Sequence, residues 1–205
     1  MFTGKYLQKH SESTNAYTDI KILTEALTPA QGFALYDAAG FTAQYSGTLN
    51  TGLQSFTTTY SGSGKGWNLV GNPYPSSIDW NAAGWTKSNI NGSIYIHKTS
   101  SSWATFNGTT GTNGGTRYIA PCQGFFVEAN AAGTLAMTNG IKVNNATPFF
   151  KNSDEAVSNL VRLEVSGNGY TDEAVVWFLP EATPEFDGQY DAHKLFGDVA
   201  EAAQI

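Results

Sequence analysis

The sequence is short of the residues that build disulfides, zinc sites and dense charge. Its 205 residues include one cysteine, three histidines and only 14% charged residues. The single Cys122 excludes an intramolecular disulfide and a cysteine-rich zinc site, but it leaves the cellular compartment open. Lys and Arg number 11 against 17 Asp and Glu, giving a net charge of −6, and they are scattered singly. Without a basic stripe to neutralise phosphates, nucleic acid is not expected as a partner.

Long apolar runs and helical periodicity are also missing. No stretch of 18 apolar residues occurs and the first 20 residues hold no hydrophobic segment, so neither a membrane span nor a signal peptide is expected in this chain. What is abundant is glycine, with 22 residues, together with 40% hydrophobic and 13% aromatic residues. This composition is too apolar for disorder and too rich in glycine for a helical bundle.

Short strand signals recur along the chain between clusters of Gly, Asn, Ser and Thr such as SGSGKG and NGTTGTNGGT. They predict an all-β fold, an antiparallel β-sandwich of jelly-roll-like type. One short helical turn is expected to start near Ser77 or Asp79, where a Ser or Asp cap precedes WNAAGW, and another is expected over residues 187–196. The predicted strands are 32–36, 54–60, 67–70, 93–98, 103–106, 124–129, 160–166 and 173–179.

Residues 160–179 predict a β-hairpin. The turn is expected near Gly167-Asn168-Gly169, because these residues suit a tight turn between two alternating runs. On this hypothesis Val161, Leu163 and Val165 face Val175 and Trp177 across the pair.

An internal repeat suggests how the chain is organised. Residues 27–40 (LTPAQGFALYDAAG) and 119–133 (IAPCQGFFVEANAAG) share Pro-x-Gln-Gly-Phe, which predicts two related β units with Phe33 and Phe125 in corresponding core positions. The first unit lacks the long lead-in of the second, so the chain is expected to be a fragment of a longer protein. The expected division is a partial first unit at 1–65, a second β-sandwich unit at 66–150, and a C-terminal hairpin with a short helix at 151–205 that packs on or continues the sandwich.

Three blocks carry a family resemblance: GWNLVGNPYPSSIDW at 66–80, APCQGFFVEA at 120–129, and LVRLEVSGNGYTDEAVVWFLPEATPEFDGQYDAHKLFG at 160–197. Together they resemble the β-rich region of secreted and surface proteins exported by the type IX secretion system, just upstream of the C-terminal sorting domain. Cys122 stands where that family commonly has Gly. The resemblance implies an extracellular or outer-surface location and an accessory role, and it says less about activity.

The block at 66–80 joins a strand to a segment that cannot continue one. Two prolines flank Tyr74, fix φ twice and remove two backbone donors. The sequence therefore predicts a rigid corner in which Asp79 caps a turn and Trp67 and Trp80 are buried.

Aromatic residues with polar neighbours are the best candidates for ligand binding. Sugar rings present an apolar face that stacks on Trp or Tyr and a rim of hydroxyls that suits Asn, Asp and Gln. Tyr74, Trp85, Trp103 and Asn72 are the candidate glycan-binding residues, each with core packing as the alternative. Alternation predicts that Trp103 shares one face with Thr105.

The acidic set Asp172, Glu173, Asp187 and Asp191 offers oxygen ligands for Ca²⁺, but no D-x-D-x-D-G loop is present. The alternative is structural: Asp172 and Glu173 cap a hairpin, and Asp187 and Asp191 hold a short helical segment. No other metal site or cofactor is expected.

Catalytic patterns are missing from the sequence. The three histidines are far apart without an HExxH pattern, and the loop SGSGKG lacks Ser or Thr after its lysine, so it is expected to be a flexible loop rather than a phosphate site. The chain is therefore expected to be a non-catalytic structural or adhesive β module of a secreted or cell-surface bacterial protein. A carbohydrate-binding module is the alternative, and a hydrolase using scattered carboxylates is the third hypothesis. The expected partner is a glycan or another surface protein, and no pattern determines the oligomeric state.

Overall fold

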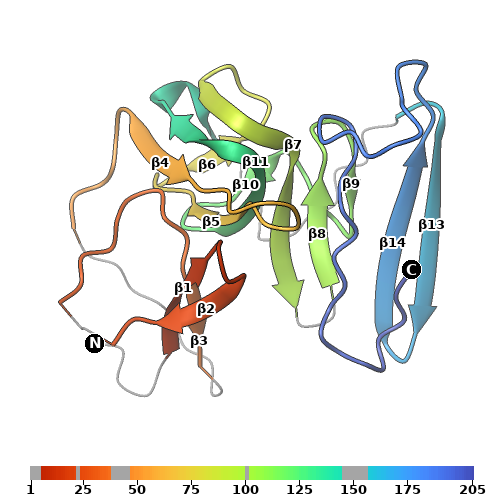
Figure 1. The fold of residues 1–205 in the computed structure, drawn as a ribbon, viewed down its shortest axis with the longest axis horizontal. Helices are drawn as coiled ribbons and strands as arrows, with labels where there is room; N and C mark the ends of the chain where they lie inside the picture. The colour runs from red at the N-terminus through yellow and green to blue at the C-terminus, as the bar shows by residue number, and fades with distance from the viewer. Residues whose placement is uncertain (1–5, 22–23, 38–46, 100–101, 145–156) are drawn as a thin grey trace. The chain divides into compact units, whose positions relative to one another are not determined.

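Regular structure in the described residues is almost entirely β-strand (Figure 1). The computed structural model describes residues 6–21, 24–37, 47–99, 102–144 and 157–205. All of the strand pairs whose register is defined in these ranges are antiparallel. The predicted all-β, sandwich-like fold class is confirmed.

The chain forms two compact units, and each is built from two separate stretches of sequence. Unit 1 comprises Met1–Ile90 and Ile119–Ala146, and unit 2 comprises Asn91–Tyr118 and Thr147–Ile205. The boundary expected at residue 66 falls inside unit 1, because the strand that begins there pairs with residues of the second stretch of that unit.

Unit 1 contains a three-stranded sheet in the order β2-β1-β3 and a long strand, β11, that pairs with three others, β4, β5 and β7 (Figure 1). β5 pairs with the first part of β11 and β4 with the last part. A further small sheet has the order β10-β6-β12, and η1 is a single 3-10 turn. These elements are β1 (Tyr6–Ser11), β2 (Ala16–Asp19), β3 (Ala34–Tyr36), β4 (Gln54–Thr58), β5 (Trp67–Gly71), β6 (Ser77–Asp79), β11 (Gly124–Met137), η1 (Asn139–Ile141) and β12 (Lys142–Val143).

Two strands run from one unit into the other along the chain, β7 (Trp85–Thr99) and β10 (Tyr118–Ile119). Unit 2 takes the second part of β7, which pairs with β8 (Ser102–Phe106), and β8 in turn pairs with β9 (Gly111–Thr112). Its last element is the hairpin of β13 (Leu160–Gly167) and β14 (Tyr170–Trp177).

The core of unit 1 lies around the predicted corner. Trp80 is 1% exposed, and its ring meets those of Trp85 and Phe125 edge-on at centroid distances of 4.9 and 6.2 Å. Asp79 caps the turn as predicted, because its carboxylate accepts from the N–H of Asn81 at 2.9 Å. Trp67, by contrast, is only half-buried. Other fully buried side chains of this unit are Val70, Tyr74, Ile78, Ile119, Val127, Leu135, Met137 and Ile141.

The two Pro-x-Gln-Gly-Phe segments repeat a turn, not a domain. In each, the N–H of the glutamine donates to the carbonyl three residues before it, at 3.2 Å in both copies, and the residue after proline has positive φ, 66° for Ala30 and 58° for Cys122. Both copies lie in unit 1, on opposite sides of β5: Gln31 bridges Val70, and β11 pairs along the other edge. The prediction of corresponding core positions is wrong, since Phe125 is buried and Phe33 is half-exposed.

Both expected helical turns are single turns rather than helices. Residues 77–79 form β6, and the turn after it is closed by the bond from the N–H of Ala82 to the carbonyl of Asp79 at 3.2 Å. Residues 187–196 contain one turn, in which Tyr190 and Asp191 donate their N–H groups to the carbonyl of Asp187. Within the described ranges, no helix has the length and hydrophobicity that crossing a bilayer requires.

The hairpin prediction is confirmed with one change. The turn residues Asn168 and Gly169 both have positive φ, 54° and 80°, as a two-residue type I′ turn requires. This turn pairs Gly167 with Tyr170, so Val161 lies opposite Val176 and Leu163 opposite Ala174. The expected partners, Val175 and Trp177, therefore point to the other face of the hairpin.

Candidate functional site

A cavity of about 200 Å³ lies within unit 2. One wall is the face of β8 and β9. Alternation along β8 places Trp103 and Thr105 on the same side, as predicted, and Thr105 lies directly opposite Thr112 of β9. Phe106 points the other way and is buried, at 6% exposed. The sequence thus builds a wall with one large aromatic side chain beside a row of hydroxyls.

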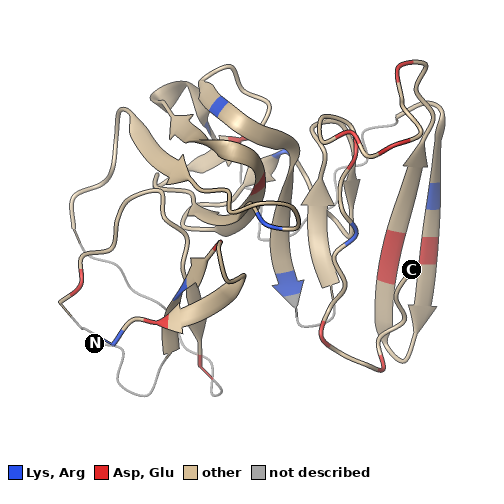
Figure 2. Cartoon of the chain, in the orientation of Figure 1, with Lys and Arg blue, Asp and Glu red and all other residues tan. Residues whose placement is uncertain are grey.

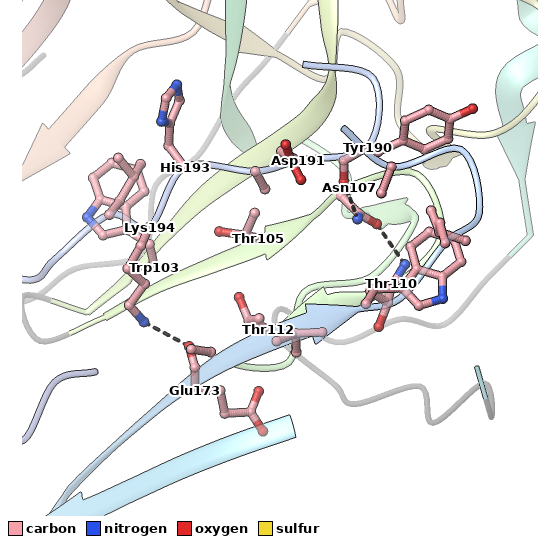
Figure 3. A pocket seen from close by; sticks show the side chains of 17 residues that line it. Trp103, Thr105, Asn107, Thr110, Thr112, Glu173, Tyr190, Asp191, His193 and Lys194 are labelled. Carbon is pink, nitrogen blue, oxygen red and sulfur yellow. Dashed lines mark hydrogen bonds between the residues drawn. The ribbon is translucent and has the colours of Figure 1, made fainter. Parts of the chain in front are cut away.

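The second wall comes from β14 and the chain that follows it. Glu173, Val175 and Trp177 share one face of β14 by alternation, and all three line the cavity. Residues 190–195 complete it. Figure 3 shows Trp103 and Tyr190 at opposite ends of the view, with Thr105 and Asp191 between them.

Asn107 fixes the loop at one end of the cavity. Its side-chain NH₂ donates to the carbonyl of Tyr190 at 2.8 Å, and its side-chain oxygen accepts from the N–H groups of Thr109 and Thr110 at 3.0 and 2.9 Å (Figure 3). The N–H of His193 donates to the Tyr95 hydroxyl at 2.9 Å. Residues 190–193 are therefore held in place by hydrogen bonds to β7 and to the loop after β8.

The charged groups beside the cavity are paired. The Lys194 ammonium lies 2.5 Å from Asp172 and donates to the carbonyl of Glu173 at 2.9 Å. Asp172 also accepts from the side-chain NH₂ of Asn113 and the N–H of Ile205. Burial by itself raises the pKa of Asp172, but these hydrogen bonds and the Lys194 charge outweigh it and hold the pKa below its ordinary value. Asp172 is therefore a permanently ionised structural group at neutral pH.

Three threonine hydroxyls and one aromatic ring of the lining suit recognition of a ligand. No described residue makes a hydrogen bond to the side-chain hydroxyls of Thr105, Thr110 or Thr112. The Trp103 ring is half-buried and meets His97 edge-on at 4.8 Å, which fixes its orientation. Burial lowers the pKa of His97, with the charge of Asp198 opposing, so this imidazole is neutral at neutral pH. An aromatic ring, hydroxyls and a carboxylate around a small cavity suit a compact polar ligand with an apolar face.

The structure brings only one of the four candidate glycan-binding residues, Trp103, to this cavity. Tyr74 is 1% exposed, and its hydroxyl lies 2.7 and 2.8 Å from the carbonyl oxygens of Gly52 and Met137, which share its single proton. Trp85 donates its indole N–H to the carbonyl of Asp79 at 2.8 Å.

Asn72 is buried in unit 1. Its NH₂ lies 2.9 Å from the carbonyls of Ser76 and Ala120, and its side-chain oxygen accepts from the N–H of Tyr74. Asn72 and Tyr74 also line a separate hollow of about 350 Å³ between the two Pro-x-Gln-Gly turns. Their polar side-chain atoms are engaged by backbone groups of the corner and of residues 52, 120 and 137.

The acidic candidates do not form a cation site in the described ranges. Asp172 and Glu173 bind Lys194 and Arg162, and Asp187 and Asp191 hold one turn through the bond from the N–H of Asp187 to the Asp191 carboxylate at 2.8 Å. In the part of the chain that is described, no three His, Cys, Asp or Glu side chains group as metal ligands would.

The loop SGSGKG binds an anion, but the anion is a side chain of the same protein. The N–H groups of Ser61 and Gly66 donate to the buried Glu12 carboxylate at 2.9 and 2.8 Å, and the Ser61 hydroxyl donates at 2.7 Å. Burial raises the pKa of Glu12, but these donors outweigh it and lower the pKa below its ordinary value. A distant carboxylate therefore holds both ends of this loop, and its flexibility stays a prediction.

Several cavity residues were not identified from the sequence, among them Asn107, Thr112, Trp177, Tyr190 and His193. Trp177 carried the clearest signal, since it ends a strand next to a proline-containing loop. The others are ordinary turn and loop residues whose proximity arises only from the fold.

Fold and site together define an all-β protein with an aromatic and hydroxyl-lined cavity in one of its two units. The chain belongs to the family described as domain of unknown function DUF8693, whose sequence model matches residues 5–202. Neither a curated protein nor a solved structure matches the chain significantly.

Proposed function

We propose that this chain is a non-catalytic adhesive module that binds a carbohydrate residue in the cavity of unit 2. The observation that carries the proposal is the position of Trp103 in one wall of that cavity, beside the hydroxyls of Thr105 and Thr112, which have no hydrogen-bond partner among the described residues. A pyranose ring has an apolar face that stacks on an indole and a rim of hydroxyls that exchange hydrogen bonds with threonine.

The size of the cavity favours a short ligand. At about 200 Å³ it is smaller than the roughly 300–1,000 Å³ of pockets for drug-sized molecules. One sugar residue, or the end of a glycan chain, fits this space better than a long oligosaccharide.

The carboxylates beside the cavity support a binding role over hydrolysis. A glycosidase needs one carboxylic acid with a raised pKa that protonates the leaving group. Asp172 has the opposite shift, and Glu173 accepts hydrogen bonds from the N–H of Asn113 at 2.6 Å and from Arg162 at 3.1 Å. Asp172 is therefore not poised to donate a proton, and the Glu173 carboxylate is engaged in structural hydrogen bonds.

Location at the outer cell surface or outside the cell is part of the proposal and rests on the resemblance to type IX secretion cargo. A glycan or another surface protein is the proposed partner. A purely structural module is the second candidate, favoured by the way the corner uses Asn72, Tyr74 and Trp85 for its own hydrogen bonds.

A glycan array followed by titration calorimetry tests the proposal. We expect a monosaccharide or a glycan terminus to bind, and Trp103→Ala to weaken binding about tenfold or more, since losing a stacking contact of about 1.4 kcal/mol has that effect. Thr105→Val removes one hydroxyl at nearly constant volume and should weaken binding less.

Trp85→Phe is the matched control. Because Trp85 lies in unit 1, this substitution should leave the affinity for the glycan unchanged. Absence of any glycan binding by the parent protein would eliminate the proposal and favour the structural module. Binding that Trp103→Ala leaves intact would show that the glycan binds elsewhere.

A further inference from the structure

Strand β13 has one edge without a partner strand among the described residues (Figure 1). Its register with β14 continues to the bond from the N–H of Phe178 to the carbonyl of Asn159, at 2.8 Å. This bond shows that Asn159 and Phe178 form a hydrogen-bonded pair. Because hydrogen-bonded and non-hydrogen-bonded pairs alternate in an antiparallel ladder, the backbone groups of Val161, Leu163 and Val165 also form hydrogen bonds with β14. The N–H and C=O groups of Leu160, Arg162, Glu164 and Ser166 therefore point away from β14, along the open edge.

One face of this hairpin is apolar and exposed. Val161 is 46% exposed, Leu163 44% and Val176 48%, and they lie side by side across β13 and β14. An open edge next to an exposed apolar face is a template for pairing with another strand.

The charges on β13 are incompletely paired within the chain. Glu164 lies directly opposite Glu173, and like charges in that position repel. Arg162 relieves part of this repulsion, because its guanidinium binds Glu173 at 3.1 Å and the carbonyl of Gly111 at 3.0 Å. Glu164 has no ion-pair partner among the described residues. Figure 2 shows the basic and acidic positions along β13 and the acidic pair on β14.

The sequence of β13 is complementary to itself in one antiparallel register. The N–H and C=O groups on the open edge belong to even-numbered residues. Two such edges therefore form hydrogen bonds only when even-numbered residues of one copy lie opposite even-numbered residues of the other. In one such register Leu163 of one copy lies opposite Leu163 of the other, so the pair is centred on Leu163. Arg162 of each copy then lies opposite Glu164 of the other, and Val161 lies opposite Val165. Centring the pair on Arg162 or on Glu164 instead places like charges opposite each other, which is unfavourable.

We propose that two copies of this chain associate through β13, antiparallel and centred on Leu163, to form a four-stranded sheet across a two-fold axis. Each Glu164 then gains the cation that it lacks, and the exposed Val161 and Leu163 gain apolar neighbours. An isologous contact of this kind closes after two copies and so gives a dimer rather than a fibre. The dimer also presents two unit 2 cavities, which would strengthen binding to a repetitive ligand.

Sedimentation velocity and equilibrium measurements on the intact chain test the association. We expect a monomer–dimer equilibrium for the parent, and Glu164→Arg to raise the dimer dissociation constant at least about tenfold, because two Arg–Arg contacts replace two ion pairs. In the Glu164→Arg variant the new arginine lies opposite Glu173 of the same hairpin, so the variant is expected to fold. The double variant Arg162→Glu/Glu164→Arg restores both ion pairs and should dimerise within about threefold of the parent.

Glu181→Arg makes the same change of charge at an exposed loop position of unit 2 and should leave the equilibrium unchanged. Leu163→Asp, which places two carboxylates at the axis, gives a second disruption, and circular dichroism verifies folding of each variant. A parent protein that stays monomeric up to roughly 1 mM overturns the proposal. A dimer that Glu164→Arg and Leu163→Asp both leave intact overturns it as well.

Discussion

Replacing Trp80 by alanine tests whether the corner at residues 72–80 holds unit 1 together. The indole is 1% exposed, contacts Trp85 and Phe125 edge-on, and lies beneath the Lys87 ammonium, 3.5 Å from the ring centroid. Truncating a buried tryptophan costs about 3–5 kcal/mol because apolar contacts are lost and a cavity remains. Against a total stability of about 5–15 kcal/mol, this loss would leave unit 1 marginal.

Hydrogen exchange measured by mass spectrometry is the appropriate assay, since the two units need not unfold together. Trp80→Ala should accelerate exchange in β5, β6 and β11 and lower the urea midpoint followed by circular dichroism. Trp103→Ala is the control: its ring is half-buried in unit 2, so the loss of stability should be smaller. If Trp80→Ala loses less than about 1 kcal/mol, the argument that this side chain seals the core is refuted.

Two further changes have effects whose direction follows from the structure. Cys122→Gly should stabilise unit 1 by about 1 kcal/mol. Cys122 has a φ of 58°, and a residue with a side chain costs about 1–2 kcal/mol in this left-handed region of backbone conformation. An unchanged or lower urea midpoint would contradict this prediction. The folded pKa of Asp172 lies below its ordinary value of 3.8, so its contribution to the stability of unit 2 is present above pH 3.8 and is lost as the pH falls through the folded pKa. Acid titration of the unfolding free energy should show this loss in the parent, and Asp172→Asn should remove it.

The strands most accurately predicted from sequence are those defined by local chemistry. Asn168-Gly169 supports a type I′ turn because both residues tolerate positive φ, and the hairpin formed where it was expected. The facing residues were predicted one position out of register, since a two-residue turn pairs Gly167 with Tyr170. Strands β1 and β2 and the short strands β6, β9, β10 and β12 lacked a sufficient local pattern and were not predicted.

The repeat shows how a correct motif led to a wrong inference about its context. Pro-x-Gln-Gly encodes a turn in which the residue after proline has positive φ, and both copies adopt it. A turn of four residues does not determine which strand its successor joins. Both copies pair with β5, and this was decided by long-range pairing that the repeat does not encode.

Among the candidate aromatic residues, sequence alone did not separate buried side chains from cavity-lining ones. Tyr74, Trp85 and Trp103 all stand among polar neighbours, yet Tyr74 is enclosed by carbonyls from residues 52 and 137, while Trp103 lines a cavity. Alternation did predict that Trp103 and Thr105 share a face, because the period of a strand is local.

Composition, alternation and turn residues thus determined the all-β class, the hairpin and the shared face of β8, because each depends on interactions between residues close in the sequence. The cavity required tertiary structure. Its walls come from residues 103–112, 173–182 and 190–195, and Glu12 binds a loop some fifty residues away. Which distant segments meet depends on how whole strands pair and bury their faces, a free-energy balance that no short stretch of sequence contains.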